Sequence, residues 1–134
     1  MKPVVLDTCV LIAGLIGQGA SARLVDAFFA DRLQLAYTAT ILAEYVDVME
    51  RPKFRIAASE RLAVLMKLRA SALEVEPVRL SAVGWPDPKD VPFVAAALAG
   101  EGKMIVTLNP RDFVPAGALG IGILSPAEAL RLVR

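Results

Sequence analysis

The chain has 134 residues, of which 56% are hydrophobic and 22% are charged, and its formal net charge is +1. This composition is typical of one folded domain and excludes intrinsic disorder, while the absence of histidine excludes Ser–His–Asp triads and imidazole metal ligands. A single cysteine excludes an internal disulfide, so we expect a reducing, cytoplasmic location. Neither a secretory signal nor about 18 consecutive uncharged apolar residues is evident, so we expect no membrane partner.

The predicted elements alternate between strands and helices along the chain. In order, they are a strand at 3–7, a helical turn at 11–16, a helix at 21–31, a strand at 33–37, a helix running into 51–52, a helix at 59–72, a strand or extended linker at 74–80, a helix from 87–88 to 100, strands at 103–107 and 121–124, and a final helix from 125–126. We expect Ser21 to cap the first long helix and either Thr38 or Thr40 to cap the next. The alternation predicts one α/β domain over residues 1–134, with a parallel sheet covered by helices.

Acidic and amide side chains fall near the ends of the predicted strands. Asp7 ends the first strand, and Asn109 and Asp112 follow the next-to-last strand. Asp90 lies in the first turn of the helix before that strand, and Glu44 lies on an otherwise apolar helix face. Functional residues of parallel sheets gather outside the carboxyl ends of the strands, and neighbouring carboxylates stay ionised together only when a cation neutralises them. Oxygen ligands without histidine or a thiolate pair favour Mg²⁺ or Mn²⁺.

Each of these residues also has a purely structural interpretation. Asp7 caps the following turn, residues 109–112 form only a turn, and Glu44 belongs to a solvated acidic helix face. Asp87 and Asp90 form a reciprocal helix cap, which accounts for Asp87 better than for Asp90 because Glu or Gln is the usual partner. A carboxylate at the end of a buried strand is costly to bury, so for Asp7 we favour a functional role.

Two further features stand out. Residues 51–55 (Arg-Pro-Lys-Phe-Arg) form a basic run with one aromatic residue. Such a run is either a solvated loop or a contact for phosphates, with Phe54 packing internally or stacking on a base. Cys9, two residues after Asp7, is predicted to be a small buried hydrophobic residue, because a soft thiol is a poor ligand for Mg²⁺.

Taken together, these segments resemble the PIN-domain ribonucleases. Val4 to Leu11 (Val-Val-Leu-Asp-Thr-Cys-Val-Leu) is similar to the family's opening strand, whose usual form there is Leu-Asp-Thr-Asn-Val-Leu. The resemblance continues, in the family's order, through residues 41–45, 51–54, 87–93, 105–113 and 125–130. Two positions depart from the pattern. Cys9 replaces the common Asn, and Asn109 stands where many members have Asp, with Asp112 three residues later as in some members of one bacterial branch.

The resemblance implies a three-layer α/β/α sandwich with a central parallel sheet, and a ribonuclease that uses Mg²⁺ or Mn²⁺ to hydrolyse RNA phosphodiester bonds. It implies catalytic roles for Asp7, Glu44, Asp90 and Asp112, metal ligation by Asp7, Asp90, Asn109 and Asp112, supporting polar contacts from Thr8 and Thr107, and RNA contacts from Arg51, Lys53, Arg55 and Arg111. An amide oxygen ligates a hard cation more weakly than a carboxylate does. Activity is therefore expected to be weakened if Asp112 does not reach the metal.

Partners and rival functions follow from the same residues. Many bacterial members of the family are VapC-type toxins, so the resemblance implies a small antitoxin partner and, with the high apolar content, a homodimer. A degenerate PIN module that binds RNA or a protein without cleavage is the alternative, supported by Cys9 and Asn109. A phosphotransferase with Asp7 as nucleophile is disfavoured, because Cys9 occupies the position where the haloacid-dehalogenase-like motif places a second Asp.

Overall fold

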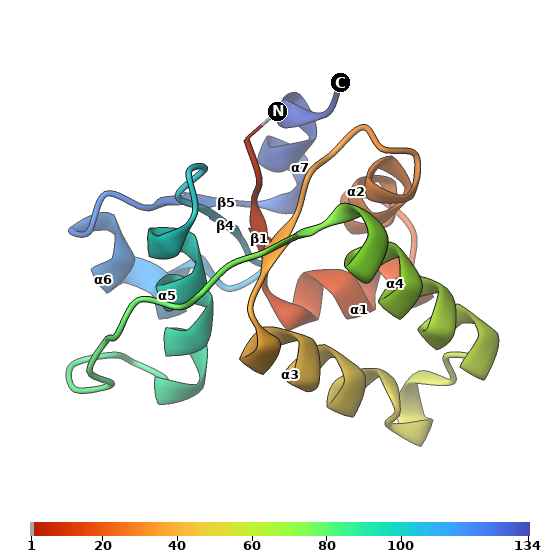
Figure 1. Ribbon diagram of the computed structural model, residues 1–134, viewed down its shortest axis with the longest axis horizontal. Helices are drawn as coiled ribbons and strands as arrows, with labels where there is room; N and C mark the ends of the chain where they lie inside the picture. The colour runs from red at the N-terminus through yellow and green to blue at the C-terminus, as the bar shows by residue number, and fades with distance from the viewer. Residues whose placement is uncertain (1) are drawn as a thin grey trace.

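A parallel sheet runs through the centre of the computed structural model, which describes residues 2–134 (Figure 1). Its strands are β1 (Val5–Leu6), β2 (Ala36–Tyr37), β3 (Leu73–Glu74), β4 (Met104–Val106) and β5 (Gly122–Leu124). β4 lies between β1 and β5, and β2 pairs with β3, with every pairing parallel. A parallel bridge between Val4 and Leu35 joins the two groups of strands. The strand order is therefore β3-β2-β1-β4-β5.

Helices cover this sheet, as the α/β prediction requires. They are α1 (Thr8–Ile16), α2 (Ala20–Phe29), α3 (Ala39–Met49), α4 (Ala58–Ser71), α5 (Val91–Ala99), α6 (Val114–Gly117) and α7 (Pro126–Ala129), with short 3-10 turns η1 (Pro52–Phe54), η2 (Pro88–Asp90), η3 (Pro110–Phe113) and η4 (Leu130–Leu132). Figure 1 shows α5 and α6 on one side of β1 and the helices α1 to α4 on the other. The observed helices and parallel central sheet confirm the predicted PIN-like α/β fold class.

Helix starts show where the sequence-based prediction was right and where it was wrong. Thr38 is the cap of α3, since its side-chain oxygen accepts a hydrogen bond from the backbone N–H of Ile41 at 3.2 Å. The prediction of Ser21 as a cap was wrong, because α2 begins at Ala20 and Gly19, two residues before Ser21, occupies the capping position with φ of 91°. Ser21 instead lies inside α2 and is buried. The Ser21 carbonyl oxygen packs closely against Gly14. A Cβ added at position 14 would lie 2.7 Å from that oxygen, so only glycine fits there.

Other boundaries differ in length. The turn expected at 11–16 is part of a longer helix that starts at Thr8, directly after Asp7. Within 74–80, strand pairing is limited to Glu74, which belongs to β3. The final helix starts at Pro126 as predicted, behind a capping box between Ser125 and Glu128. Among residues 2–134, no single helix is long and apolar enough to cross a membrane; α1 and α2 together would meet that test, but they are bent by 91°.

The strand ends bring polar side chains to one edge of the core. β1 and the last two residues of β4 are almost fully buried, as are the neighbouring side chains of Val4 and Leu35. The buried polar residues Asp7, Thr38 and Thr107 directly follow β1, β2 and β4. Because parallel strands end at the same edge, this is the place where a site is expected in such a sheet.

Candidate active site

Asp7 is fixed by contacts from the end of β4 and from α1. The backbone N–H of Asp7 donates to the carbonyl of Val106 at 2.9 Å, which continues the pairing of β1 with β4. Its Oδ2 accepts a hydrogen bond from Thr107 Oγ1 at 2.8 Å and another from Cys9 Sγ at 3.3 Å. Although Asp7 precedes α1, its side chain makes no capping hydrogen bond. The capping interpretation of Asp7 therefore fails, and its carboxylate is held at the strand end by side-chain donors.

Cys9 is a hydrogen-bond donor as well as a packing residue. It is half-buried, which differs from the expectation of a purely apolar role. Burial, followed by the negative charge of Asp7, raises the pKa of the Cys9 thiol to about 11. Cys9 therefore keeps its proton at neutral pH and presents a neutral thiol to Asp7 where the family usually has an amide.

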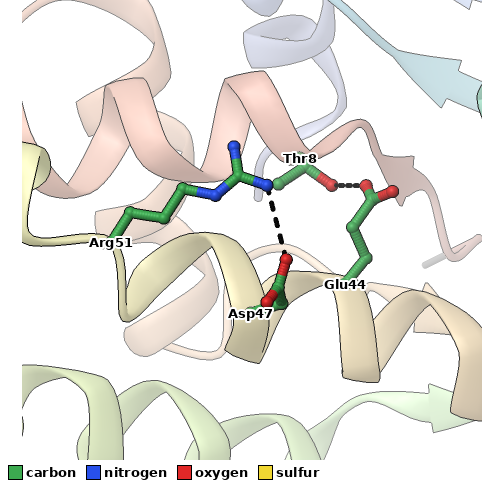
Figure 2. Close-up of polar contacts among 4 residues, drawn as sticks. All are labelled: Thr8, Glu44, Asp47 and Arg51. Atoms are coloured by element: carbon green, nitrogen blue, oxygen red, sulfur yellow. Dashed lines mark hydrogen bonds and ion pairs between the residues drawn. The ribbon is translucent and has the colours of Figure 1, made fainter.

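Glu44 is brought to the same edge by α3. The neighbouring residue Tyr45 is buried, and its hydroxyl donates to the carbonyl of Leu6 at 2.5 Å, which ties α3 to the end of β1. The Thr8 hydroxyl donates to Glu44 Oε2, so the carboxylate points toward the start of α1 (Figure 2). Glu44 is half-buried and hydrogen-bonded. These contacts argue against the alternative of a freely solvated acidic face.

Asp90 has a carboxylate with an unsatisfied oxygen. Asp87 caps η2 by accepting a hydrogen bond from the backbone N–H of Lys89 at 2.9 Å. Among the described residues, the buried Oδ2 of Asp90 has no hydrogen-bond partner, so the reciprocal cap expected from Asp90 is not formed through this atom. Burial, followed by the negative charges of Asp7 and Asp87, raises the pKa of Asp90 to about 7. An unpaired carboxylate under such repulsion is the kind of group that a bound cation stabilises.

An open cleft joins Glu44 to Asp90. Its volume is about 490 Å³, which is within the usual range for ligand pockets. Its polar lining residues are Thr8, Cys9, Glu44, Arg51, Asp87, Lys89 and Asp90, and its apolar lining residues are Ile12, Ala13, Ile16, Val48 and Phe54. The cleft thus has an acidic end near the strand edge and an apolar wall built from α1, α3 and η1.

Three of the predicted acidic-site positions, Asp7, Asn109 and Asp112, lie outside that lining, and Asp7 is buried. Asn109 is exposed, and its backbone N–H donates to Thr107 Oγ1 at 3.0 Å. Asp112 is half-buried in η3, and its charge contributes to the raised pKa of Asp90. Asp112 is therefore electrostatically part of the cluster, while the side chain of Asn109 is solvent-exposed and does not line the cleft.

The predicted RNA-contacting cations are exposed, and one of them lines the cleft. Arg51 lies along the space between α1 and α3, points toward Thr8 and Glu44, and pairs with Asp47 at 3.3 Å (Figure 2). Lys53 Nζ lies 5.0 Å from the centre of the Phe54 ring. Arg55 adopts a left-handed backbone conformation with φ of 53°, and Arg111 lies in η3 near the cluster's edge.

The donor set fits a hard divalent cation, although the side chains do not converge on a single point. Among residues 2–134, no three carboxylate or thiol side chains lie close enough together to hold a metal ion as they stand. Within the same range, Asp7, Glu44 and Asp90 form no ion pair with Lys or Arg. The unpaired oxygen of Asp90 and the mutual repulsion of the carboxylates are what a cation would relieve.

Sequence reasoning missed part of the cleft. Lys89 was treated only as part of a helix cap, yet it lines the cleft beside Asp90. The apolar wall was also missed, although its signals were present in the spacing. Ile12 and Ile16 are four residues apart, and Val48 follows Glu44 by four, so each pair shares one helix face.

Comparison with known proteins supports the same interpretation. A family model described as a PIN domain matches residues 3–111, which is most of the chain and includes β1 to β4 with all the carboxylates of the cleft. No curated protein matches the chain.

Proposed function

The chain belongs to the PIN-domain family, whose members are typically nucleases that use divalent metal ions, and we propose that it is a metal-dependent endoribonuclease. The single observation that carries this proposal is the buried, unpaired Oδ2 of Asp90 at the acidic end of the cleft, beside Glu44 and within electrostatic reach of Asp7. Structural carboxylates are normally hydrogen-bonded or paired when buried. The simplest explanation for a buried carboxylate oxygen with no hydrogen bond and no ion pair is that it has a function.

In this proposal, Asp7, Glu44 and Asp90 would hold Mg²⁺ or Mn²⁺, with Asp112 at the edge of the cluster. The ion, when bound, lowers the pKa of a water molecule and stabilises charge on the phosphate. Thr107 and Cys9 hold the Asp7 carboxylate in place through the hydrogen bonds to its Oδ2.

The cations and the remaining carboxylate have separate tasks. Arg51 and Lys89, which both line the cleft, would contact phosphate oxygens on the substrate, as Lys and Arg side chains commonly do in nucleic-acid complexes. Asp112, or Asp90 through a bound water, would accept the proton that the attacking water loses, and the charge of Asp112 already acts on Asp90. The substrate phosphate therefore lies at the acidic end, between these groups.

Metal dependence is tested by incubating purified protein with single-stranded RNA after EDTA treatment and then restoring Mg²⁺ or Mn²⁺. We expect internal cleavage that stops in EDTA and returns with either ion. Cleavage that continues unchanged in EDTA would contradict the metal-dependent mechanism. RNA that stays intact across several sequences and both ions would reject the nuclease proposal.

Binding without cleavage is the second candidate function. It is favoured by the separation of the carboxylates, which do not converge on one metal position, and by the exposure of Asn109 outside the cleft. In that case the protein would bind RNA or a protein partner but leave the RNA intact with either metal. Replacing Asn109 with Asp would then be the first change to test for restored cleavage.

A role as the toxin of a VapC-type toxin–antitoxin pair is a further part of the proposal. It rests on the sequence resemblance to that bacterial branch, and it includes a cytoplasmic location and a small protein antitoxin. A homodimer is proposed as well, because large apolar side chains such as Leu62 and Met66 on α4 are more than half exposed. Light scattering of the purified chain tests the dimer, and co-expression with a neighbouring small gene product tests the antitoxin.

A further inference from the structure

The apolar wall of the cleft is not explained by metal binding or by phosphate contacts. Ile12 and Ile16 of α1 face Val48 of α3, and Phe54 of η1 closes the same cavity. Ile16 is 51% exposed, and Phe54 is only half-buried. Large apolar side chains left partly in water around a cavity commonly mark a place where an apolar group binds.

Charged side chains near this wall indicate that the ligand carries an anionic group next to its apolar part. The Arg51 guanidinium points toward Thr8 and Glu44 (Figure 2), and Lys89 lines the same cleft as Asp90. Lys53 lies over the Phe54 ring at 5.0 Å. The cleft thus combines an apolar surface, cations and carboxylates in one cavity. A nucleotide next to a scissile phosphate carries the matching groups, a flat base and an anionic phosphate.

We propose that the wall formed by Ile12, Ile16, Val48 and Phe54 is a base-binding subsite, which holds one unpaired base of the substrate while the adjacent phosphate reaches Arg51 and the acidic end. This inference rests on the proposed nuclease function and names the substrate group that its cleft selects. A base that is paired and stacked in a duplex cannot reach this wall, whereas an unstacked base can lie against its aromatic and aliphatic side chains. Phe54 and Ile16 are then specificity-determining residues that act on binding.

The test measures binding, so that it does not depend on cleavage. Every protein carries Asp7→Asn to keep the RNA intact, and fluorescence anisotropy in Mg²⁺ reports the affinity for a short labelled single-stranded RNA. A second set of RNAs lacks the base at one position, moved along the strand. We expect Phe54→Ala to weaken binding of the intact RNA roughly tenfold. When the missing base is the one that the subsite holds, the parent protein should bind that RNA about tenfold more weakly than the intact RNA. Phe54→Ala should then weaken binding of the same RNA no further.

Controls separate this subsite from a general effect on folding. Phe29→Ala removes an exposed aromatic ring of α2 that does not line the cleft, and it should leave every affinity unchanged. Ile16→Ser changes a side chain that is already 51% exposed, so the fold should persist while base-dependent affinity falls. Thermal unfolding of each variant checks this.

The outcomes also distinguish the subsite from the nuclease. If binding depends on one base but the wild-type protein never cleaves RNA, the subsite stands and the nuclease proposal fails. If the wild type cleaves RNA but Phe54→Ala weakens intact and base-deleted RNA equally, the subsite is wrong and Phe54 only packs η1. If the protein binds no RNA, or binds duplex as tightly as single strands, the subsite is also rejected.

Discussion

Asp90 is the residue through which the acidic cleft lowers the folding stability of the metal-free protein. Its pKa is raised from 3.8 to about 7, by burial first and then by the negative charges of Asp7 and Asp87. A raised carboxyl pKa contributes stability that is fully present below the unfolded pKa and is lost as the pH rises through the folded value. The metal-free protein should therefore lose stability between about pH 4 and pH 8.

Replacing this carboxylate tests the electrostatic argument. Without metal at pH 8, Asp90→Asn should raise the free energy of unfolding by about 1–2 kcal/mol, a value discounted for partial exposure, and the gain should shrink toward pH 4. Denaturant unfolding at both pH values measures it. Glu50→Gln, which removes an exposed carboxylate directly after α3, is the control and should change little at either pH. An Asp90→Asn protein that is less stable at pH 8 would contradict the account.

The candidate site also shows which residues the sequence could predict. Asp7, Glu44 and Asp90 were predicted from an acid at a strand end, an acid on an apolar helix face and an acid in the first turn of a helix, and their catalytic roles stay a prediction. The hydrogen bond from Cys9 to Asp7 and the position of Lys89 depend on side-chain directions after folding, which the residue pattern does not contain. The sequence also did not predict that Asn109 is exposed, because its exposure depends on the path of the chain into η3.

At the scale of elements, Tyr45 links α3 to the sheet. Its buried hydroxyl donates to the Leu6 carbonyl at 2.5 Å. Tyr45 directly follows Glu44, and Leu6 directly precedes Asp7, so this hydrogen bond holds both acidic residues near each other. Tyr45→Phe should lower the free energy of unfolding by about 1–3 kcal/mol, because the carbonyl loses this donor. It should also reduce RNA cleavage by loosening Glu44. Calorimetry and the cleavage assay measure the two effects.

The matched control for that variant is the other tyrosine. Tyr37 donates to Glu74 Oε1 at 3.4 Å, and Glu74 is exposed, so water replaces this contact easily. Tyr37→Phe should change stability by less than about 0.5 kcal/mol and leave cleavage unchanged. Equal effects of the two substitutions would mean that the Tyr45 hydroxyl does not position α3.

The turn before β4 requires glycine because the chain passes very close to the start of β1. A Cβ added at Gly102 would lie 1.8 Å from the carbonyl oxygen of Pro3, so one backbone must move. Gly102→Ala should destabilise the protein by about 2–4 kcal/mol and weaken the pairing of β1 with β4. Gly117→Ala in α6 is the control, since an added Cβ meets nothing within 4 Å there, and it should be neutral or slightly stabilising. Equal melting temperatures for the two variants would contradict this close approach.

Helix and strand positions were largely predictable, whereas their exact ends were not. The apolar runs at β1 and β4 and the caps at Thr38 and Ser125 carry strong local signals. The start of α2 was missed because Gly19, with its positive φ, provides the entry to the helix in place of the expected serine. The pairing of β3 with β2 is a contact between distant segments, which a local pattern cannot specify.

For the whole molecule, the parallel sheet explains why residues far apart in sequence act together. The order β3-β2-β1-β4-β5 places the ends of β1 and β4 side by side, so Asp7 and Thr107 are in contact although 100 positions separate them. α3 then adds Glu44, and η2, at the start of α5, adds Asp90 to the same cleft. We propose that RNA is cleaved at this assembled acidic end and at no other surface of the protein.

The most direct test compares the RNA cleavage rates of wild type, Asp7→Asn and Glu50→Gln with Mn²⁺, using protein of equal purity. Both substitutions remove one carboxylate, but only Asp7 belongs to the cleft's acidic cluster. The account predicts that Glu50→Gln keeps the wild-type rate and that Asp7→Asn falls by at least about a hundredfold, since it loses a group that holds the metal. Equal rates for wild type and Asp7→Asn would contradict the claim and place the activity elsewhere.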